Sequence, residues 1–188
     1  MPADSLQSAD KMLQVRAENW PEAATPISQL MVRVYRLASL VRDNATEQVD
    51  RYGLTLIEFE VLVALRGVAP PYELVPTDLY TAVLISSGGL TKVLHGLQRR
   101  GLISRGKNKL DRRSKPIRLT AKGRDTVEWA MEDVLRSDAQ LISKGLSEGE
   151  LADLTGLLRK LLGTIEPGGN NAGTEDDRGY PAGRPFAK

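Results

Sequence analysis

The cationic side chains of this chain are concentrated in one stretch. Twelve of its 26 Lys and Arg residues, but only one of its 24 Asp and Glu residues, Asp111, lie between Ser86 and Arg124. This basic block has a formal charge of +11, whereas the rest of the chain carries −9 and the whole chain +2. Charge separated in this way is typical of proteins that bind a polyanion, most often nucleic acid. A solvated charged surface is the alternative, and charge this one-sided disfavours it.

The residue types needed for catalysis or metal binding are scarce. The chain has no cysteine, and His95 is its only histidine. A Ser-His-Asp triad would have to use His95, and a zinc site would have one imidazole and no thiolate. A nuclease or hydrolase would need clustered carboxylates or an activated nucleophile, yet Asp111 stands alone in the basic block. We therefore expect no enzyme activity, metal ion, cofactor or disulfide.

A helix predicted inside the basic block has two unlike faces. It is expected from about Ser87 to Arg100, with Gly101 in the position that ends it. One face is apolar and carries Leu90, Val93, Leu94 and Leu97. The opposite face carries Gly88, Thr91, Lys92, His95 and Arg99. A DNA recognition helix needs this division, and the N–H groups at its start, with Ser86 and Ser87, suit a phosphate. An ordinary amphipathic surface helix is the alternative.

A cationic hairpin is expected after this helix. Leu102 to Arg105 and Pro116 to Leu119 are typical of short strands, and a polar loop joins them. The loop cations are Lys107, Lys109, Arg112, Arg113 and Lys115. Such a loop can follow the DNA backbone and place an arginine in the minor groove. Asp111 is expected to hold Arg113 through a charge-assisted hydrogen bond, unless it simply favours the turn.

Six further helices are predicted around these elements. Their approximate ranges are Ala9 to Trp20, Ile27 to Gly53, Thr55 to Arg66, Thr77 to Leu84, Thr120 to Lys144 and Ser147 to Leu162. Two of them begin with capping boxes, Thr55-Leu56-Ile57-Glu58 and Ser147-Glu148-Gly149-Glu150. The order of elements in the middle of the chain predicts a mainly α fold with a small β-hairpin wing, a winged helix-turn-helix.

The motifs of the basic block resemble those of the MarR family of bacterial transcriptional regulators. Leu110-Asp111-Arg112-Arg113-Ser114, followed by Ile117 to Gly123, resembles the wing of that family. Ser86 to Lys92, continued by Leu97 to Ile103, resembles its recognition helix. The resemblance covers roughly residues 27 to 163. It implies a homodimer that binds double-stranded DNA at a palindromic operator and regulates transcription. The protein would act as a repressor, and a small ligand, anionic or not, would release it from the DNA.

The resemblance also implies DNA contacts. They are Ser86, Ser87, Thr91, Lys92 and His95 from the recognition helix, Arg112 and Arg113 from the wing with Asp111 as their brace, Thr77 on a phosphate, and Arg105 and Lys107 at the base of the wing.

The resemblance divides the chain into five parts. They are an N-terminal extension (1–26), an N-terminal dimerisation helix (27–53), a winged helix-turn-helix DNA-binding domain (54–120), C-terminal dimerisation helices (121–166) and a disordered tail (167–188). Apolar stripes suited to a dimer line the last two helices, although they could serve a core within one chain. With no signal-peptide pattern and no long apolar run, we expect a cytoplasmic protein.

A narrower resemblance concerns a ligand. Glu18-Asn19-Trp20-Pro21, Phe59-Glu60-Val61 and Pro70-Pro71-Tyr72 resemble the urate-sensing, PecS-type branch of the family. Its ligand pocket has an aromatic residue, an acidic residue and two arginines, and three of these map onto Trp20, Glu60 and Arg105. The second arginine falls at Val93, which cannot pair with an anion, so urate itself is in doubt. Trp20 could instead pack the extension onto the body, and Arg105 could contact DNA.

One alternative function stays open. An architectural DNA-binding protein, with little sequence preference and no ligand switch, would share the basic block and the fold. RNA binding is less expected, because the basic block has no aromatic surface on which bases could stack.

Overall fold

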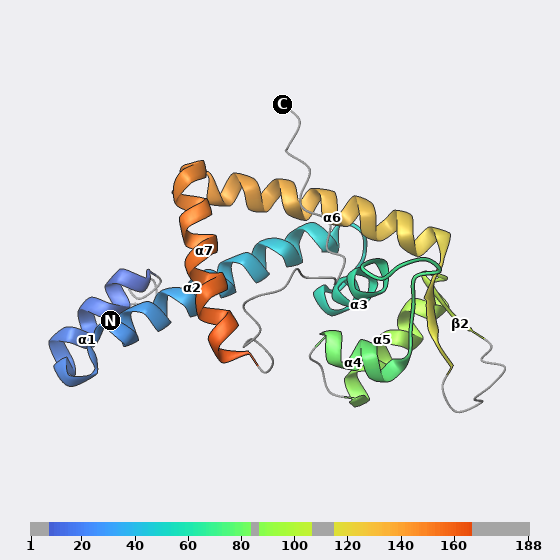
Figure 1. Cartoon of the computed structure of the whole chain (residues 1–188), viewed down its shortest axis with the longest axis horizontal. Helices are drawn as coiled ribbons and strands as arrows, with labels where there is room; N and C mark the ends of the chain where they lie inside the picture. The colour runs from blue at the N-terminus through green and yellow to red at the C-terminus, as the bar shows by residue number, and fades with distance from the viewer. Residues whose placement is uncertain (1–7, 84–86, 107–114, 167–188) are drawn as a thin grey trace. The chain divides into compact units, whose positions relative to one another are not determined.

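The computed structural model describes residues 8–83, 87–106 and 115–166 (Figure 1). The elements in these ranges are α1 (Ala9–Asn19), the 3-10 helix η2 (Pro21–Ala23), α2 (Pro26–Asp50), α3 (Leu56–Arg66), β1 (Glu73–Leu74), α4 (Pro76–Val83), α5 (Ser87–Arg99), β2 (Ile103–Arg105), β3 (Ile117–Leu119), α6 (Ala121–Ile142) and α7 (Glu148–Ile165). The chain forms two compact units that divide between Leu141 and Ile142. The mainly α fold with a small antiparallel sheet confirms the predicted fold class, whereas the five-part division into functional regions stays a prediction.

Helix ends follow the signals in the sequence. The Thr55 hydroxyl accepts a hydrogen bond from the Glu58 N–H, and the Glu58 carboxylate accepts one from the Thr55 N–H, which completes the first predicted capping box. Ser147 and Glu150 form the second in the same way. Gly101 follows α5 with a φ of +71°, a left-handed conformation that favours glycine. Both capping boxes and the end of the recognition helix are thus confirmed.

The sheet has three strands in the order β1-β3-β2, all antiparallel. Ile103 pairs with Leu119 and Arg105 with Ile117, as expected for a hairpin. On its other side β3 pairs with β1, where Glu73 lies opposite Arg118. The sequence predicted two strands and missed β1, because a two-residue strand is too short to show alternation.

A single apolar core joins the winged elements to the long helices of the first unit. Leu62 and Leu65 of α3, Leu79 of α4, Leu97 of α5 and Ile117 of β3 have no exposed surface. Val49 of α2 and Val127 of α6 belong to the same core. Burying one such side chain stabilises the fold by about 1.5–3 kcal/mol. The apolar face predicted for the recognition helix is therefore the face that holds α5 in place.

Other apolar surfaces stay exposed in each unit. In α2, the side chains of Ile27 and Tyr35 are 70% and 69% exposed. In α7 no residue is buried, and Leu157 and Ile165 are each 66% exposed. The extension covers part of α2, since Leu13 of α1 is buried and Asp10 forms an ion pair with Arg33 at 2.6 Å. Both units therefore expose apolar side chains that the core of the first unit does not bury.

Candidate nucleic-acid interface

The outward face of α5 collects the side chains predicted to read DNA. Thr91, Lys92 and His95 are exposed, and with Gln98 and Arg99 they line a hollow of about 740 Å³ along the helix. Their opposite neighbours Leu90, Leu94 and Leu97 are buried. Hydroxyl, ammonium and imidazole groups can all donate to base edges or phosphates. The structure thus brings the three predicted recognition residues together on one anchored helix.

A second hollow, of about 560 Å³, lies between α4, α5 and β2. Three of the predicted DNA contacts line it, namely Thr77, Thr91 and Arg105. The Arg105 Nε donates a hydrogen bond of 3.3 Å to Oε1 of Gln98, which ties β2 to the outward face of α5. The hydroxyls of Thr77 and Thr91 and the guanidinium of Arg105, around one concave surface, can hold an anionic group, whether a phosphate or a carboxylate.

The basic block is not uniformly available to DNA. Arg100 is paired with Glu58 at 3.1 Å, Arg118 with Glu73 at 2.7 Å and Arg124 with Asp125 at 3.0 Å. Among the residues that the structure describes, the other cations of the block form no ion pair; they are Lys92, Arg99, Arg105, Lys115 and Lys122. Counting charge along the sequence therefore overstates the cationic surface, since Glu58 and Glu73 lie outside the block.

Several predicted contacts lie outside the described residues. These are Ser86, Lys107, Asp111, Arg112 and Arg113, together with the side chain of Ser87, whose backbone begins α5. Their roles on DNA stay predictions.

The three predicted ligand residues have separate surroundings. Trp20 ends α1 with its side chain 63% exposed. Glu60 of α3 forms an ion pair with Arg42 of α2 at 3.6 Å. Arg105 contacts Gln98 at the recognition helix. Of the three, Arg105 lines a described hollow, the one beside α4 and α5. A ligand pocket shared by Trp20, Glu60 and Arg105 stays a prediction.

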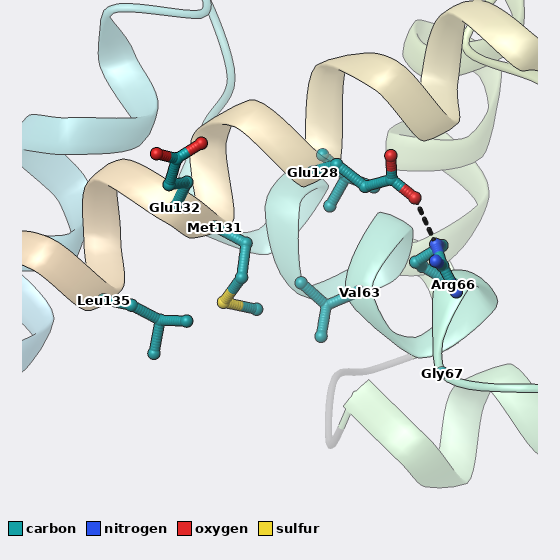
Figure 2. A pocket seen from close by; sticks show the side chains of 8 residues that line it. Val63, Arg66, Gly67, Glu128, Met131, Glu132 and Leu135 are labelled. Carbon is teal, nitrogen blue, oxygen red and sulfur yellow. Dashed lines mark hydrogen bonds and ion pairs between the residues drawn. The ribbon is translucent and has the colours of Figure 1, made fainter. Parts of the chain in front are cut away.

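Sequence reasoning missed a hollow of about 430 Å³ between α3 and α6. Figure 2 shows Val63 of α3 and Met131 and Leu135 of α6 around it, with Arg66 and Glu128 joined at one side. The Arg66 Nε lies 2.7 Å from Oε1 of Glu128, and the guanidinium also lies 4.9 Å above the ring of Tyr72. The two walls are distant in the sequence, since Arg66 and Glu128 lie 62 positions apart. Each wall alone is typical of an ordinary amphipathic helix, so the sequence carries no signal of the hollow.

In the described ranges, no helix is long and apolar enough to cross a membrane. No group of three or more His, Asp or Glu side chains in the same ranges could hold a metal ion.

Comparison with known proteins identifies the family. A family model described as MarR family matches residues 52–114. The HTH-type transcriptional regulator PecS of Dickeya dadantii (strain 3937) is 30% identical over 162 residues, which cover 86% of this chain and 93% of PecS.

Solved structures agree with this similarity. Apo MarR from E. coli is 26% identical, with a TM-score of 0.64 over 73% of this chain and 97% of MarR. A mutant MarR from E. coli, complexed with operator DNA, is 25% identical, with a TM-score of 0.62 over 79% and 98% of the two chains. These proteins are transcriptional regulators and not enzymes. Because the similarity to PecS spans nearly the full length of both proteins, this chain belongs to the MarR family of DNA-binding transcriptional regulators.

Proposed function

We propose that the chain is a homodimeric repressor that binds a palindromic operator and is released by a small ligand. The observation that carries the proposal is the outward face of α5, where Thr91, Lys92 and His95 are exposed on a helix whose other face is buried. A helix fixed in this way can present the same donors to every copy of a DNA site, which sequence recognition requires.

Backbone contacts would come from the surroundings of this face. Thr77 and Arg105 line the hollow beside α5 and would contact a phosphate there. Ser86, Ser87 and the wing residues Lys107, Arg112 and Arg113, with Asp111 as a brace, complete the proposed set. Such contacts position the protein on the duplex, while α5 supplies sequence preference.

The exposed apolar surfaces support a homodimer. Single soluble chains rarely expose contiguous apolar patches larger than a few hundred Å². Both α2 and α7 carry exposed apolar side chains in rows, including Ile27 and Leu30 of α2 and Leu157, Leu161 and Leu162 of α7. A second copy of the chain would cover such rows, and its twofold symmetry would be matched by a palindromic operator.

DNA binding across a salt series tests the proposal. The probe is duplex DNA from the region upstream of the gene that encodes the chain, with random duplex of the same length as competitor. We expect binding that resists the competitor and weakens steeply with salt. Equal, weak binding to both duplexes would contradict sequence recognition and support the architectural alternative. Repression is tested separately, by a reporter placed behind the bound region.

Two hollows could receive the ligand. The hollow around Thr77, Thr91 and Arg105 suits an anion, which would compete with DNA for the same groups. The hollow between α3 and α6 has apolar walls, and its only described guanidinium, Arg66, is already engaged by Glu128. It therefore suits an uncharged ligand that would act on the position of α3. The proposal also includes a role for Trp20 or Glu60 in the response of the chain to its ligand.

A matched pair of ligands separates the two hollows. We expect 2-naphthoate to displace DNA through Arg105, so that the Arg105→Gln variant loses this response. We expect uncharged 2-naphthol to bind between α3 and α6, so that Met131→Trp, which fills that hollow, loses the second response. The measurement is fluorescence anisotropy of labelled operator. If neither compound releases DNA at any concentration below that which unfolds the protein, both ligand assignments are wrong.

A further inference from the structure

The C-terminal end of α5 is held by a group of polar contacts, here called the α5 anchor, which consists of Glu58, Arg100, Thr120 and Lys122. Nη1 of Arg100 donates a hydrogen bond of 3.1 Å to Oε2 of Glu58. Lys122 Nζ donates to the carbonyl oxygen of Arg100 at 3.1 Å, and the Thr120 hydroxyl donates to that of Gly101 at 2.7 Å. The residues that follow α5 are therefore tied to the first turn of α3 and to the start of α6.

Glu58 has two roles in this group. The oxygen that accepts from Arg100 also accepts from the Thr55 N–H at 3.0 Å, so the carboxylate belongs to the capping box of α3 as well. Its side chain is only 14% exposed. A Cβ at Gly96 would lie 3.3 Å from Oε1 of Glu58, a tight approach, so glycine lets α5 pass close to the carboxylate. Glu58 thus meets α5 at Gly96 and again, one turn later, at Arg100.

We propose that Glu58 is a positioning residue for DNA recognition, which acts through Arg100 on the orientation of α5. Apolar packing of Leu94 and Leu97 holds the helix to the core but is not directional. A hydrogen bond between a carboxylate and a guanidinium is directional and charge-assisted. It fixes the rotation of α5 about its own axis, and hence the direction in which the side chains of Thr91, Lys92 and His95 point. This inference rests on the proposed role of α5 in reading DNA.

The direction in which a mutation at Glu58 changes DNA affinity distinguishes a positioning role from a purely electrostatic one. A carboxylate near a DNA-binding face repels phosphates, so its removal alone would raise affinity for every duplex. Loss of a positioning contact would instead lower affinity for the chosen site and leave random DNA unaffected. Glu58→Gln can be compared on both duplexes, because glutamine is also found at this position of a capping box.

The salt dependence of an Arg100 variant is an independent test. If Arg100 neutralised a phosphate, Arg100→Gln would make the negative slope of log K against log salt shallower by about 0.9. If its partner is Glu58, the variant lowers affinity for the specific site with the slope unchanged. The basic block in the sequence cannot distinguish these roles, since Arg100 counts as one cation in either case.

The experiment uses the full chain and two duplexes, one obtained by in vitro selection and one random. Anisotropy titrations between about 50 and 200 mM salt compare the wild type with Glu58→Gln, Arg100→Gln and the double variant. Glu47→Gln is the control, because it removes the same charge from an ion pair between the last turn of α2 and Arg51, the residue that follows it. We expect each single variant to lower the ratio of specific to random affinity about fivefold and the double variant to lower it no further. Glu47→Gln should leave the ratio unchanged.

Other results at Glu58 or Arg100 would contradict the positioning role. Unchanged or higher affinity of Glu58→Gln for the selected site would mean that the carboxylate acts only as a charge. A lower salt slope for Arg100→Gln, or additive losses in the double variant, would remove the coupling on which the proposal rests. If Glu58→Gln has a lower thermal midpoint than Glu47→Gln, the decision passes to Arg100→Gln, which leaves the capping box intact. Failure of the wild type to prefer any selected duplex would instead contradict the proposed function.

Discussion

Cations of the basic block differ in what they can contribute to DNA affinity. Arg105 is exposed, and its side chain hydrogen-bonds to the neutral side chain of Gln98. Within the described part of the chain it forms no ion pair, so its charge is available to a phosphate. Arg118, one strand away, has its charge matched by Glu73, with a hydrogen bond of 2.8 Å. An arginine that neutralises a phosphate releases a counterion from the DNA. An arginine whose charge stays matched by an acidic partner neutralises the phosphate less and therefore contributes less to counterion release.

This difference predicts unequal salt dependence for two matched variants. Arg105→Gln should weaken DNA binding and lower the slope of log K against log salt by about 0.9, since one phosphate contact is lost. Arg118→Gln removes the same charge but should change the slope much less. Anisotropy titrations of the selected duplex from about 50 to 200 mM salt measure both slopes. Equal slope losses would mean that the pairing with Glu73 does not persist on DNA.

Predictability at this scale depends on distance along the chain. The charge of the basic block and the outward set Thr91, Lys92 and His95 could be predicted, because helical periodicity alone places them on one face. The partners of Arg100 and Arg118 could not, because Glu58 and Glu73 lie 42 and 45 positions away. Such pairs arise only when the sheet and the helices of the core assemble.

Polar side chains join the region of α2 to α6, among them Tyr52. The Tyr52 hydroxyl, just after α2, donates a hydrogen bond of 2.7 Å to Oδ2 of Asp133 in α6. The hydrogen bond and the negative charge of Asp133 favour the neutral phenol, and with burial they raise the pKa of Tyr52 above its usual value of 10.0. The link therefore exists only while the phenol keeps its proton.

Removing this hydrogen bond should lower the free energy of unfolding by an amount that depends on pH in a defined way. Tyr52→Phe should lower the free energy of unfolding by about 1 kcal/mol near neutral pH, the net value of one hydrogen bond. Because the folded-state pKa is raised, the contribution is complete below pH 10 and is lost as pH rises through the folded-state pKa. Urea unfolding at pH 7 and pH 9 should give the same difference between wild type and variant. A difference that already disappears at pH 9 would contradict the raised pKa.

Secondary structure was predictable where a local signal marks it. The capping boxes at Thr55 and Ser147, and the glycine after α5, place three helix ends from a few residues each. The strand β1 and the helix η2 contain two and three residues, too few for any periodic pattern. β1 pairs with β3, which is distant in sequence, so its formation depends on the assembled wing.

The proposed association of two chains concerns the whole molecule. In α7, Leu158 belongs to the exposed apolar row and Ala152 lies on the opposite side of the helix. Leu158→Glu should weaken the proposed homodimer because it would place a charge in an apolar interface. Ala152→Glu adds the same charge outside the row and should have little effect. Sedimentation velocity over a hundredfold range of concentration measures both. A wild-type chain that stays monomeric throughout would contradict the dimer.

The proposed dimer also restricts the geometry of the operator. Two α5 helices related by twofold symmetry would enter successive major grooves on one side of the duplex, with half-site centres about 10–10.5 base pairs apart. Inserting five base pairs between the half-sites rotates one of them by about half a turn, so that both can no longer be bound by one dimer. Affinity should then fall to that of a duplex with one intact half-site, which is the matched control. The same insertion placed outside both half-sites should have no effect. Equal affinity for the two insertions would mean that each α5 binds independently, and the symmetric dimer would not be the DNA-binding form.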